Sequence, residues 1–292
     1  SACQSSRRWR FMTQPGLRFD RTCPTLRIPM QEDPNKNMAK DNRVAFECPH
    51  LEARIRQELI SRFGPELKER PIADGDLDRL NEALQADDGN LALNGYGISD
   101  LSPLAGLTNL RSLYVNSSRI RDFSPLRELP GFVELALGPS LLPPSEKENL
   151  NKYEEPARYV LFRPPERVEG SEMEIEDLTP LAGLRNLKAL DMASLHKVAD
   201  LSPLSALENL RSLRLSGYGL SDYSPLFGLG NLEALFLPHC RLTDPAPLAK
   251  LRNLKNLVLL RSAFTDRQIK ALAESLPGCS VTSCVKEFMR NQ

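Results

Sequence analysis

The sequence predicts an α/β solenoid, in which short units stack side by side and no unit is stable alone. Two observations lead to this fold class. A tripeptide of the Ser-Pro-Leu kind recurs six times, mostly 22 residues apart, and leucines around it keep constant offsets. The six copies begin at Ser102, Ser124, Thr179, Ser202, Ser224 and Ala246.

Each unit is expected to contain one short strand. In residues 201–220 the leucines are three apart until Leu213 and Leu215, which are two apart. Side chains alternate across a strand, so Leu213 and Leu215 should point inward and Arg214 outward. Similar triplets are centred on Tyr114, Phe236 and Val258. Stacked copies of this strand predict one parallel sheet.

The other half of each unit is expected to form a short helical or 3₁₀ turn on the convex side. An aspartate stands two residues before each of the six tripeptides, and proline is the second residue of each tripeptide. Asp and Ser cap helical turns well, and proline lacks the N–H that a first turn leaves unpaired. The aspartates are Asp100, Asp122, Asp177, Asp200, Asp222 and Asp244.

At these residues the chain resembles the bacterial, internalin-like class of leucine-rich repeat proteins, which has 22-residue units. The motif Asn-Leu-x-x-Leu-x-Leu, or a close variant, begins at Asn109, Asn186, Asn209, Asn231 and Asn253. The resemblance implies a curved right-handed solenoid whose concave parallel sheet binds another macromolecule, usually a protein. The family's own asparagine, which bonds neighbouring turns, is replaced here, so no regular ladder is expected at Tyr96, Ser118, Tyr218, Cys240 and Ser262.

The array, predicted over residues 91–264, contains an insertion at about 139–175. Pro125 and Pro180 are 55 residues apart, which equals two units of 22 and 11 further residues. Residues 139–156 are rich in Pro, Glu, Lys and Asn, which indicates an exposed excursion. Residues 159–162 have strand character, so we expect a degenerate unit that keeps the sheet continuous, followed by an acidic loop over 166–176. The insertion is either a tolerated surface segment or a binding loop.

Helical segments are expected to close both ends of the array. Apolar residues at helical spacing predict a helix over 51–63, and Asp76 is expected to cap a second helix over 76–86; together they form an N-terminal cap over 49–90. Downstream, Asp266 is expected to cap a helix that ends before Pro277, with a last strand over 280–285, within a C-terminal cap over 265–292. Residues 1–48 are expected to be an irregular leader.

Composition narrows the classes of partner. The chain has 292 residues with 38 basic and 38 acidic side chains, and this balance argues against nucleic acid as a partner. Its longest apolar runs are too short to span a bilayer, so we expect no transmembrane segment. An arginine-rich stretch at residues 7–10 is expected to be a solvated tail rather than a binder of anionic surfaces.

The cysteines offer the one indication of compartment. Ser1-Ala2-Cys3 resembles the end of a bacterial lipobox, in which the cysteine is lipidated, and we expect that an upstream segment was removed. If that resemblance holds, Cys23 could pair with Cys48 and Cys279 with Cys284 in an oxidising cell envelope or outside the cell. Reduced, scattered thiols of a cytoplasmic protein are the open alternative.

Features of catalysis are sparse, so we expect no enzyme, no catalytic residue, no metal site and no cofactor. The sequence has three histidines and neither a phosphate-binding glycine loop nor a Cys-x-x-Cys spacing. His239 and Cys240 are adjacent, but neighbouring strand residues face different directions, which opposes a Cys-His nucleophile.

The outward strand positions define a predicted binding surface for a protein partner. It comprises Tyr114, Arg211, Arg214, Phe236, His239, Val258 and Arg261. A flanking basic row holds Arg111, Lys188, Arg211 and Lys255 and could belong to this surface or be a solvated face. We expect a monomeric interaction module, anchored through lipid on Cys3 in the bacterial envelope. The alternatives are an intracellular scaffold or regulatory subunit, and an effector or enzyme that uses the repeats to capture substrate.

Overall fold

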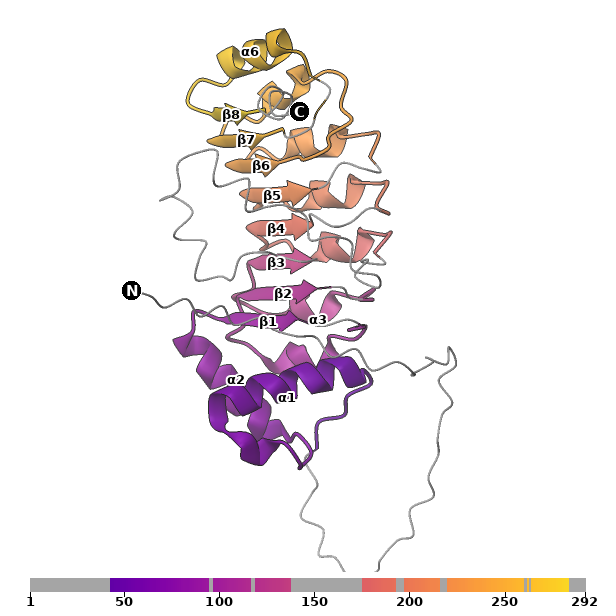
Figure 1. The fold of residues 1–292 in the computed structure, drawn as a ribbon, viewed down its shortest axis with the longest axis vertical. Coiled ribbons are helices and arrows are strands. Elements are labelled where there is room, and N and C mark those ends of the chain that lie inside the picture. The colour runs from indigo at the N-terminus through magenta and orange to yellow at the C-terminus, as the bar shows by residue number, and fades with distance from the viewer. Residues whose placement is uncertain are drawn as a thin grey trace, which may run out of the picture. The chain divides into compact units, whose positions relative to one another are not determined.

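The computed structural model describes residues 43–94, 97–116, 119–137, 175–192, 197–215, 220–259, 262 and 264–283. Within these ranges, eight strands form one parallel sheet in sequence order (Figure 1). They are β1 (Asn90–Asn94), β2 (Ser112–Asn116), β3 (Glu134–Leu137), β4 (Ala189–Met192), β5 (Ser212–Leu215), β6 (Ala234–Phe236), β7 (Asn256–Val258) and β8 (Ser280–Thr282).

Neighbouring strands are aligned so that equivalent residues of successive units form continuous rows. Leu213 of β5 is paired with Leu190 of β4 and with Leu235 of β6. Leu213 and Leu215 are fully buried, whereas Arg214 between them is half-buried on the opposite face. The alternation predicted from the spacing of two is therefore confirmed.

Short turns follow the strands, as the tripeptide predicted. In each, the Oδ1 atom of the preceding aspartate accepts a hydrogen bond from the N–H two residues later, at 2.8 to 3.0 Å. The hydroxyl and backbone N–H groups of Thr179 and Ser202 lower the pKa values of Asp177 and Asp200. The turns are η2 (Ser102–Gly106), α3 (Ser124–Arg127), η4 (Thr179–Gly183), η5 (Ser202–Ala206), η6 (Ser224–Gly228) and η7 (Ala246–Lys250).

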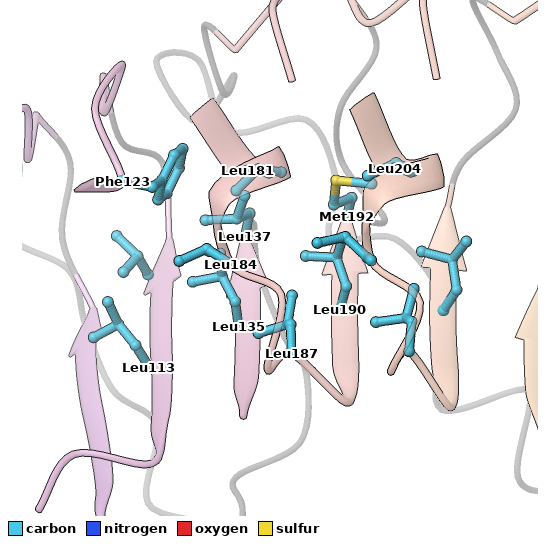
Figure 2. Close-up of a cluster of buried hydrophobic side chains, with 14 of the residues drawn as sticks. Leu113, Phe123, Leu135, Leu137, Leu181, Leu184, Leu187, Leu190, Met192 and Leu204 are labelled. Carbon is cyan, nitrogen blue, oxygen red and sulfur yellow. The ribbon is translucent and has the colours of Figure 1, made fainter. Parts of the chain in front are cut away.

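The hydrophobic core lies between the sheet and these turns. Figure 2 shows Leu181 of η4 beside Leu137 of β3, and Leu204 of η5 beside Met192 of β4, with Leu190 further along β4. All five side chains are buried. Burying one such side chain contributes about 1.5 to 3 kcal/mol, and each unit shares its leucines with its neighbours. Stacking therefore stabilises units that could not fold singly.

An asparagine ladder is present, at a different position from the one considered in the sequence. The side-chain amides of Asn209, Asn231 and Asn253 donate to carbonyl oxygens of the preceding unit, at 2.9, 2.8 and 2.7 Å. These residues open the Asn-Leu motif that precedes each strand. Of the positions considered earlier, Cys240 is buried and Ser262 donates to Leu259 of its own unit, while 96, 118 and 218 lie outside the described residues.

The structure overturns the prediction of a degenerate unit inside the insertion. Strand β3 pairs directly with β4, with Glu134 opposite Ala189. The N–H groups of Lys188 and Ala189 both donate to the carbonyl of Val133, at 2.7 and 3.0 Å. Because β4 occupies the hydrogen-bonding edge of β3, no further strand lies between them. Residues 159–162 lie outside the described residues.

At the N-terminal end, α1 (Pro49–Phe63), η1 (Pro65–Leu67) and α2 (Asp74–Ala86) cover the first unit. Leu51, Ile55 and Leu59 of α1 are fully buried, as their helical spacing predicted. The cap assignment was wrong, because α2 begins two residues before Asp76. Asp76 stands in the first turn, accepts from the N–H of Ala73 at 2.9 Å, and binds both terminal nitrogens of Arg70 at 2.7 and 2.6 Å.

The leader predicted for residues 1–48 falls mostly outside the described residues. Its last part, from Arg43, forms one isolated antiparallel bridge, between Arg43 and Ala73, and is attached to the cap. The N–H of Val44 donates to the carbonyl of Ile72 at 3.0 Å, and Cys48 is buried.

At the C-terminal end, α6 (Asp266–Ser275) precedes β8 (Figure 1). The predicted cap at Asp266 was wrong by one residue. Thr265 is the N-cap, and its Oγ1 accepts from the N–H of Gln268 at 3.3 Å while the Gln268 side chain accepts from the N–H of Thr265 at 2.9 Å. Threonine and aspartate are both good caps, and the reciprocal Gln decides between them.

Candidate functional site

The outer face of the sheet, opposite the buried leucines, carries a row of side chains that we call the outer row. Its central part comes from four consecutive strands, with Asp191 opposite Arg214, Arg214 opposite Phe236, and Phe236 opposite Val258. Strands of one sheet lie about 4.8 Å apart, so these side chains are close neighbours. The complete row is Ala92, Tyr114, Ala136, Asp191, Arg214, Phe236, Val258 and Thr282.

The centre of the outer row combines a charged pair with an aromatic ring. The Nη1 atom of Arg214 lies 3.6 Å from Oδ2 of Asp191, and each side chain is 24% exposed. Phe236 stands on the next strand and is partly exposed. The guanidinium is thus oriented by its neighbour while part of it stays open to a partner.

Two of the predicted binding residues are not exposed. Tyr114 is 4% exposed and Val258 only 2%, so neither can serve as a protruding anchor. Val258 lies in its row between Phe236 and Thr282. Tyr114 is flanked in its row by Ala92 and Ala136. The alternation of side chains along the strand predicted which face Tyr114 and Val258 lie on, but it did not predict that both would be buried.

His239 and Cys240 follow β6 and have different environments. His239 has a left-handed backbone, with φ of 58°, and is half-buried. Cys240 is buried, and its Sγ accepts from the N–H of Leu242 at 3.4 Å. Burial raises the pKa of the Cys240 thiol, which favours the neutral form and not a reactive thiolate. Arg261, the remaining residue predicted near His239, lies outside the described residues.

A buried tyrosine supports the segment that carries His239 and Cys240. The hydroxyl of Tyr223 accepts from the N–H of Arg241 at 3.1 Å. Burial raises the pKa of Tyr223 to about 12. The phenol therefore stays neutral and holds the loop after β6 in place.

A second line of side chains, the edge row, stands where the chain enters each strand. Its members are joined by backbone hydrogen bonds, in which the N–H of each donates to the carbonyl of the preceding member at 2.7 to 2.8 Å. Four of the six are basic, and they include the predicted residue Arg211. The row is Arg111, Val133, Lys188, Arg211, Glu233 and Lys255.

Glu233 is the carboxylate of the edge row and is held by two cations. Its Oε1 lies 3.3 Å from Nη1 of Arg211, and its Oε2 lies 2.5 Å from Nζ of Lys255. The hydrogen bond and charge of Lys255, with the charge of Arg211, lower the pKa of Glu233. A glutamate at the middle position of three adjacent strands can therefore form ion pairs with the edge-row cations on both sides of it.

The basic residues of the edge row were predicted from the sequence, but which residues are neighbours in the row was not. Residues 133 and 188 are 55 positions apart, so nothing in the repeat period indicates that Val133 and Lys188 are neighbours. Glu233 was not predicted as part of this row, because only the basic residues of the row were considered.

The cysteine predictions involve residues that the structure does not describe. Cys48 and Cys279 form no disulfide with another described residue, and Cys3, Cys23 and Cys284 lie outside the described residues. Both predicted disulfides and the lipidation site stay predictions. In the described part of the chain, no cluster of three or more His, Cys, Asp or Glu side chains is placed to bind a metal ion. None of the helices there is long and apolar enough to cross a membrane.

No family model matches the sequence, and no curated protein is similar to it. Among solved structures, internalin C2 of Listeria monocytogenes is similar over 85% of this chain and 89% of its own, with 23% identity and a TM-score of 0.57. Internalin InlF of Listeria monocytogenes is 19% identical over 81% of this chain and 88% of its own, with a TM-score of 0.27. A leucine-rich repeat protein of Leptospira interrogans is 17% identical over 63% of this chain and 52% of its own, with a TM-score of 0.34.

The latter two scores are too low to bear on the fold. The likeness to internalin C2, together with the stacked parallel strands and capped turns, shows the leucine-rich repeat fold.

Proposed function

We propose that this chain, a leucine-rich repeat solenoid, binds another protein through the outer face of its sheet. The observation that carries the proposal is the partly exposed Asp191–Arg214 pair on the strands next to Phe236. Arginine and aromatic side chains are the commonest anchors of protein interfaces. All three residues stand on hydrogen-bonded strands, so a partner meets a surface that is already ordered, which lowers the entropic cost of binding.

The other predicted residues extend this surface from its centre. His239 lies just beyond the end of β6, and Arg211 lies just before the start of β5, so they flank the Arg214 and Phe236 side chains at opposite strand ends. Arg261 is proposed to join them from the chain after β7. Tyr114 and Val258 are buried and are proposed to support the surface without contacting the partner.

The proposal is tested by affinity capture followed by reconstitution. The purified chain and the double variant Arg214→Glu/Phe236→Glu are used as baits, and proteins retained by the parent alone are identified by mass spectrometry. Each retained protein is then purified and titrated against both baits by calorimetry. Loss of at least tenfold in affinity is expected for the variant, which is the range of hot-spot substitutions.

A matched control separates the outer face from general surface charge. Arg267→Glu/Lys270→Glu changes two exposed residues of α6, away from the outer row, and should bind as the parent does. Circular dichroism must show that every variant stays folded. Equal affinity of the outer-row variant and the parent for each reconstituted partner would refute this binding surface and favour the insertion at about 139–175 as the binding segment.

We also propose that the protein is a non-enzymatic, monomeric component of a bacterial cell envelope, anchored through lipid on Cys3. The lipobox-like Ser1-Ala2-Cys3 supports this compartment, in which we also propose that Cys23 pairs with Cys48 and Cys279 with Cys284. Thiol titration of the denatured, unreduced protein should find one reactive thiol, that of Cys240, because the lipid occupies the sulfur of Cys3, and Cys3→Ser should abolish incorporation of labelled fatty acid. Six titratable thiols and no label would favour a cytoplasmic scaffold.

A further inference from the structure

The edge row contains the same arrangement of cations twice, with one difference. On β5, β6 and β7 the row has Arg211, Glu233 and Lys255, so a carboxylate stands between two cations. On β2, β3 and β4 the row has an arginine, then Val133, then a lysine. The first arginine is Arg111 and the lysine is Lys188. The position of the acid is thus taken by an apolar residue.

The two places have equal spacing because both span three adjacent strands. Strand separation of about 4.8 Å puts the outer members of each trio about 10 Å apart. Backbone bonds of 2.8 Å from Val133 to Arg111 and 2.7 Å from Lys188 to Val133 match those that join the other trio, 2.7 Å from Glu233 to Arg211 and 2.7 Å from Lys255 to Glu233. A carboxylate above Val133 could therefore reach both cations, as Glu233 does.

Arg111 is directed toward this place. A methyl group added at Gly131, which leads into β3, would lie 3.6 Å from Cγ and 3.7 Å from Nε of Arg111. A methyl group added at Gly89, which precedes β1, would lie 2.5 Å from the same Cγ, so the Arg111 stem runs past both strand entries and its Nε lies on the β3 side. Gly131 has no side chain to obstruct it.

Both cations are available to a ligand. Arg111 and Lys188 are exposed, and within the described ranges neither forms an ion pair. The carboxylate nearest along the chain is that of Glu134, the first residue of β3. Its Oε2 accepts a hydrogen bond from the hydroxyl of Ser112, the first residue of β2, at 3.2 Å.

We propose that Arg111 and Lys188 hold a carboxylate of an acidic protein segment, which occupies above Val133 the place that the Glu233 side chain occupies in the other trio. This rests on the proposed function and names the chemistry of the partner. The partner lays an acidic stretch along the edge row while its apolar and polar side chains meet the outer row.

A protein carboxylate fits this row better than a phosphate polymer does. Glu233 stands in the edge row, Glu134 lies in the next row, and Asp191 lies in the outer row beyond it. A continuous phosphate backbone would pass close to these carboxylates, which would repel it. A protein segment can instead carry acidic residues only at the positions that face cations.

The test uses a fluorescent peptide of alternating Glu and Ser, about twelve residues long, because an extended chain of that length covers the six strands of the row. The same peptide with Gln for Glu is the uncharged comparison. Binding is measured by anisotropy at low ionic strength, where exposed ion pairs are least screened. The partner need not be known for this measurement.

Two reciprocal substitutions address the place itself. Val133→Glu supplies an internal carboxylate and should weaken peptide binding about fivefold, the effect of losing one or two exposed ion pairs. Glu233→Val releases Arg211 and Lys255 and should strengthen binding by a similar factor. Arg111→Gln/Lys188→Gln should weaken binding as Val133→Glu does. Lys250→Gln/Arg267→Gln removes equal charge from exposed residues outside the edge row and should change binding less than twofold.

The proposal is overturned if the Glu peptide binds no better than the Gln peptide, or if Val133→Glu and the control variant bind alike. It is also overturned if a thymidine oligonucleotide binds more tightly than the peptide and loses that binding in Val133→Glu. Any of these results leaves the capture experiment with Arg214→Glu/Phe236→Glu unaffected, so failure here is distinguishable from failure of the outer row as a binding surface.

Discussion

Replacing Asp76 by alanine should destabilise the N-terminal cap more than any other single change of a charged side chain in α2. The carboxylate has only 4% of its side chain exposed. It binds Arg70 through two hydrogen bonds, at 2.7 and 2.6 Å, and accepts from the N–H of Ala73 at 2.9 Å. Alanine removes all three contacts together.

The magnitude follows from these contacts. Hydrogen bonds to a charged group are worth about 1.5 to 3 kcal/mol, and the lower part of this range applies because the Arg70 side chain is 45% exposed and regains water. Loss of the acceptor for the Ala73 N–H adds about 1 kcal/mol, as for other helix caps. We therefore expect the free energy of unfolding to fall by about 2 to 3 kcal/mol.

The assay is urea denaturation followed by circular dichroism, with Asp78→Ala as the control. Asp78 stands two residues further along α2 and is exposed. Its replacement should change the free energy of unfolding by less than about 0.5 kcal/mol.

The effect of Asp76→Ala should also depend on pH. The hydrogen bonds from Arg70 lower the pKa of Asp76, so the ionised form is favoured in the folded state. The stabilisation is therefore complete above the unfolded pKa, about 4, and is lost as pH falls through the lower folded value. A loss below about 1 kcal/mol at neutral pH, or a difference from the parent that stays constant toward pH 3, would refute the reasoning.

Three further predictions concern the array. Leu213→Ala should cost about 2 to 5 kcal/mol because Leu213 is fully buried, whereas Arg214→Ala should cost under about 1 kcal/mol; urea titration of both variants checks the alternation of the strand. Asn231→Ala should cost about 0.5 to 1.5 kcal/mol by removing the 2.8 Å bond to the Glu208 carbonyl, and a stability unchanged in thermal unfolding would show that the ladder is incidental. Tyr223→Phe should alter alkaline unfolding, because a pKa raised to about 12 gives stability that is present below the unfolded value of about 10 and is lost as pH rises toward 12. A parent and variant that lose stability in parallel above pH 10 would contradict that pKa.

Sequence patterns correctly predicted the strands and turns, because these elements are determined by residues close together in the chain. Leucine spacing predicted the strands, because the face of a strand that is buried is decided by adjacent residues. Aspartate two residues before Ser-Pro predicted the capped turns for the same reason. The caps of α2 and α6 were misplaced by one or two residues, since neighbouring side chains could serve equally and only the reciprocal bonds decide.

The errors concern relations between distant parts of the chain. Residues 159–162 have strand character, but a strand can join a sheet only at a free edge, and β4 already occupies the edge of β3. Exposure of Tyr114 and Val258 likewise depends on what lies beside and above them. The site above Val133 could not be predicted from the sequence. Lys188 is 55 residues away along the chain and becomes its neighbour only because β3 pairs directly with β4.

The direct pairing of β3 with β4 has a consequence for the order of folding. Equivalent residues of β2 and β3 are 22 positions apart, whereas Glu134 and Ala189 are 55 apart. Closing the longer loop costs about 0.8 kcal/mol more, which slows that step about fourfold. The array should therefore nucleate separately on the two sides of this junction, and formation of the β3–β4 contact should be the late event that joins two preformed halves. Pulse-labelled hydrogen exchange would show the amides of Lys188 and Ala189 protected after those of Arg211 and Ser212.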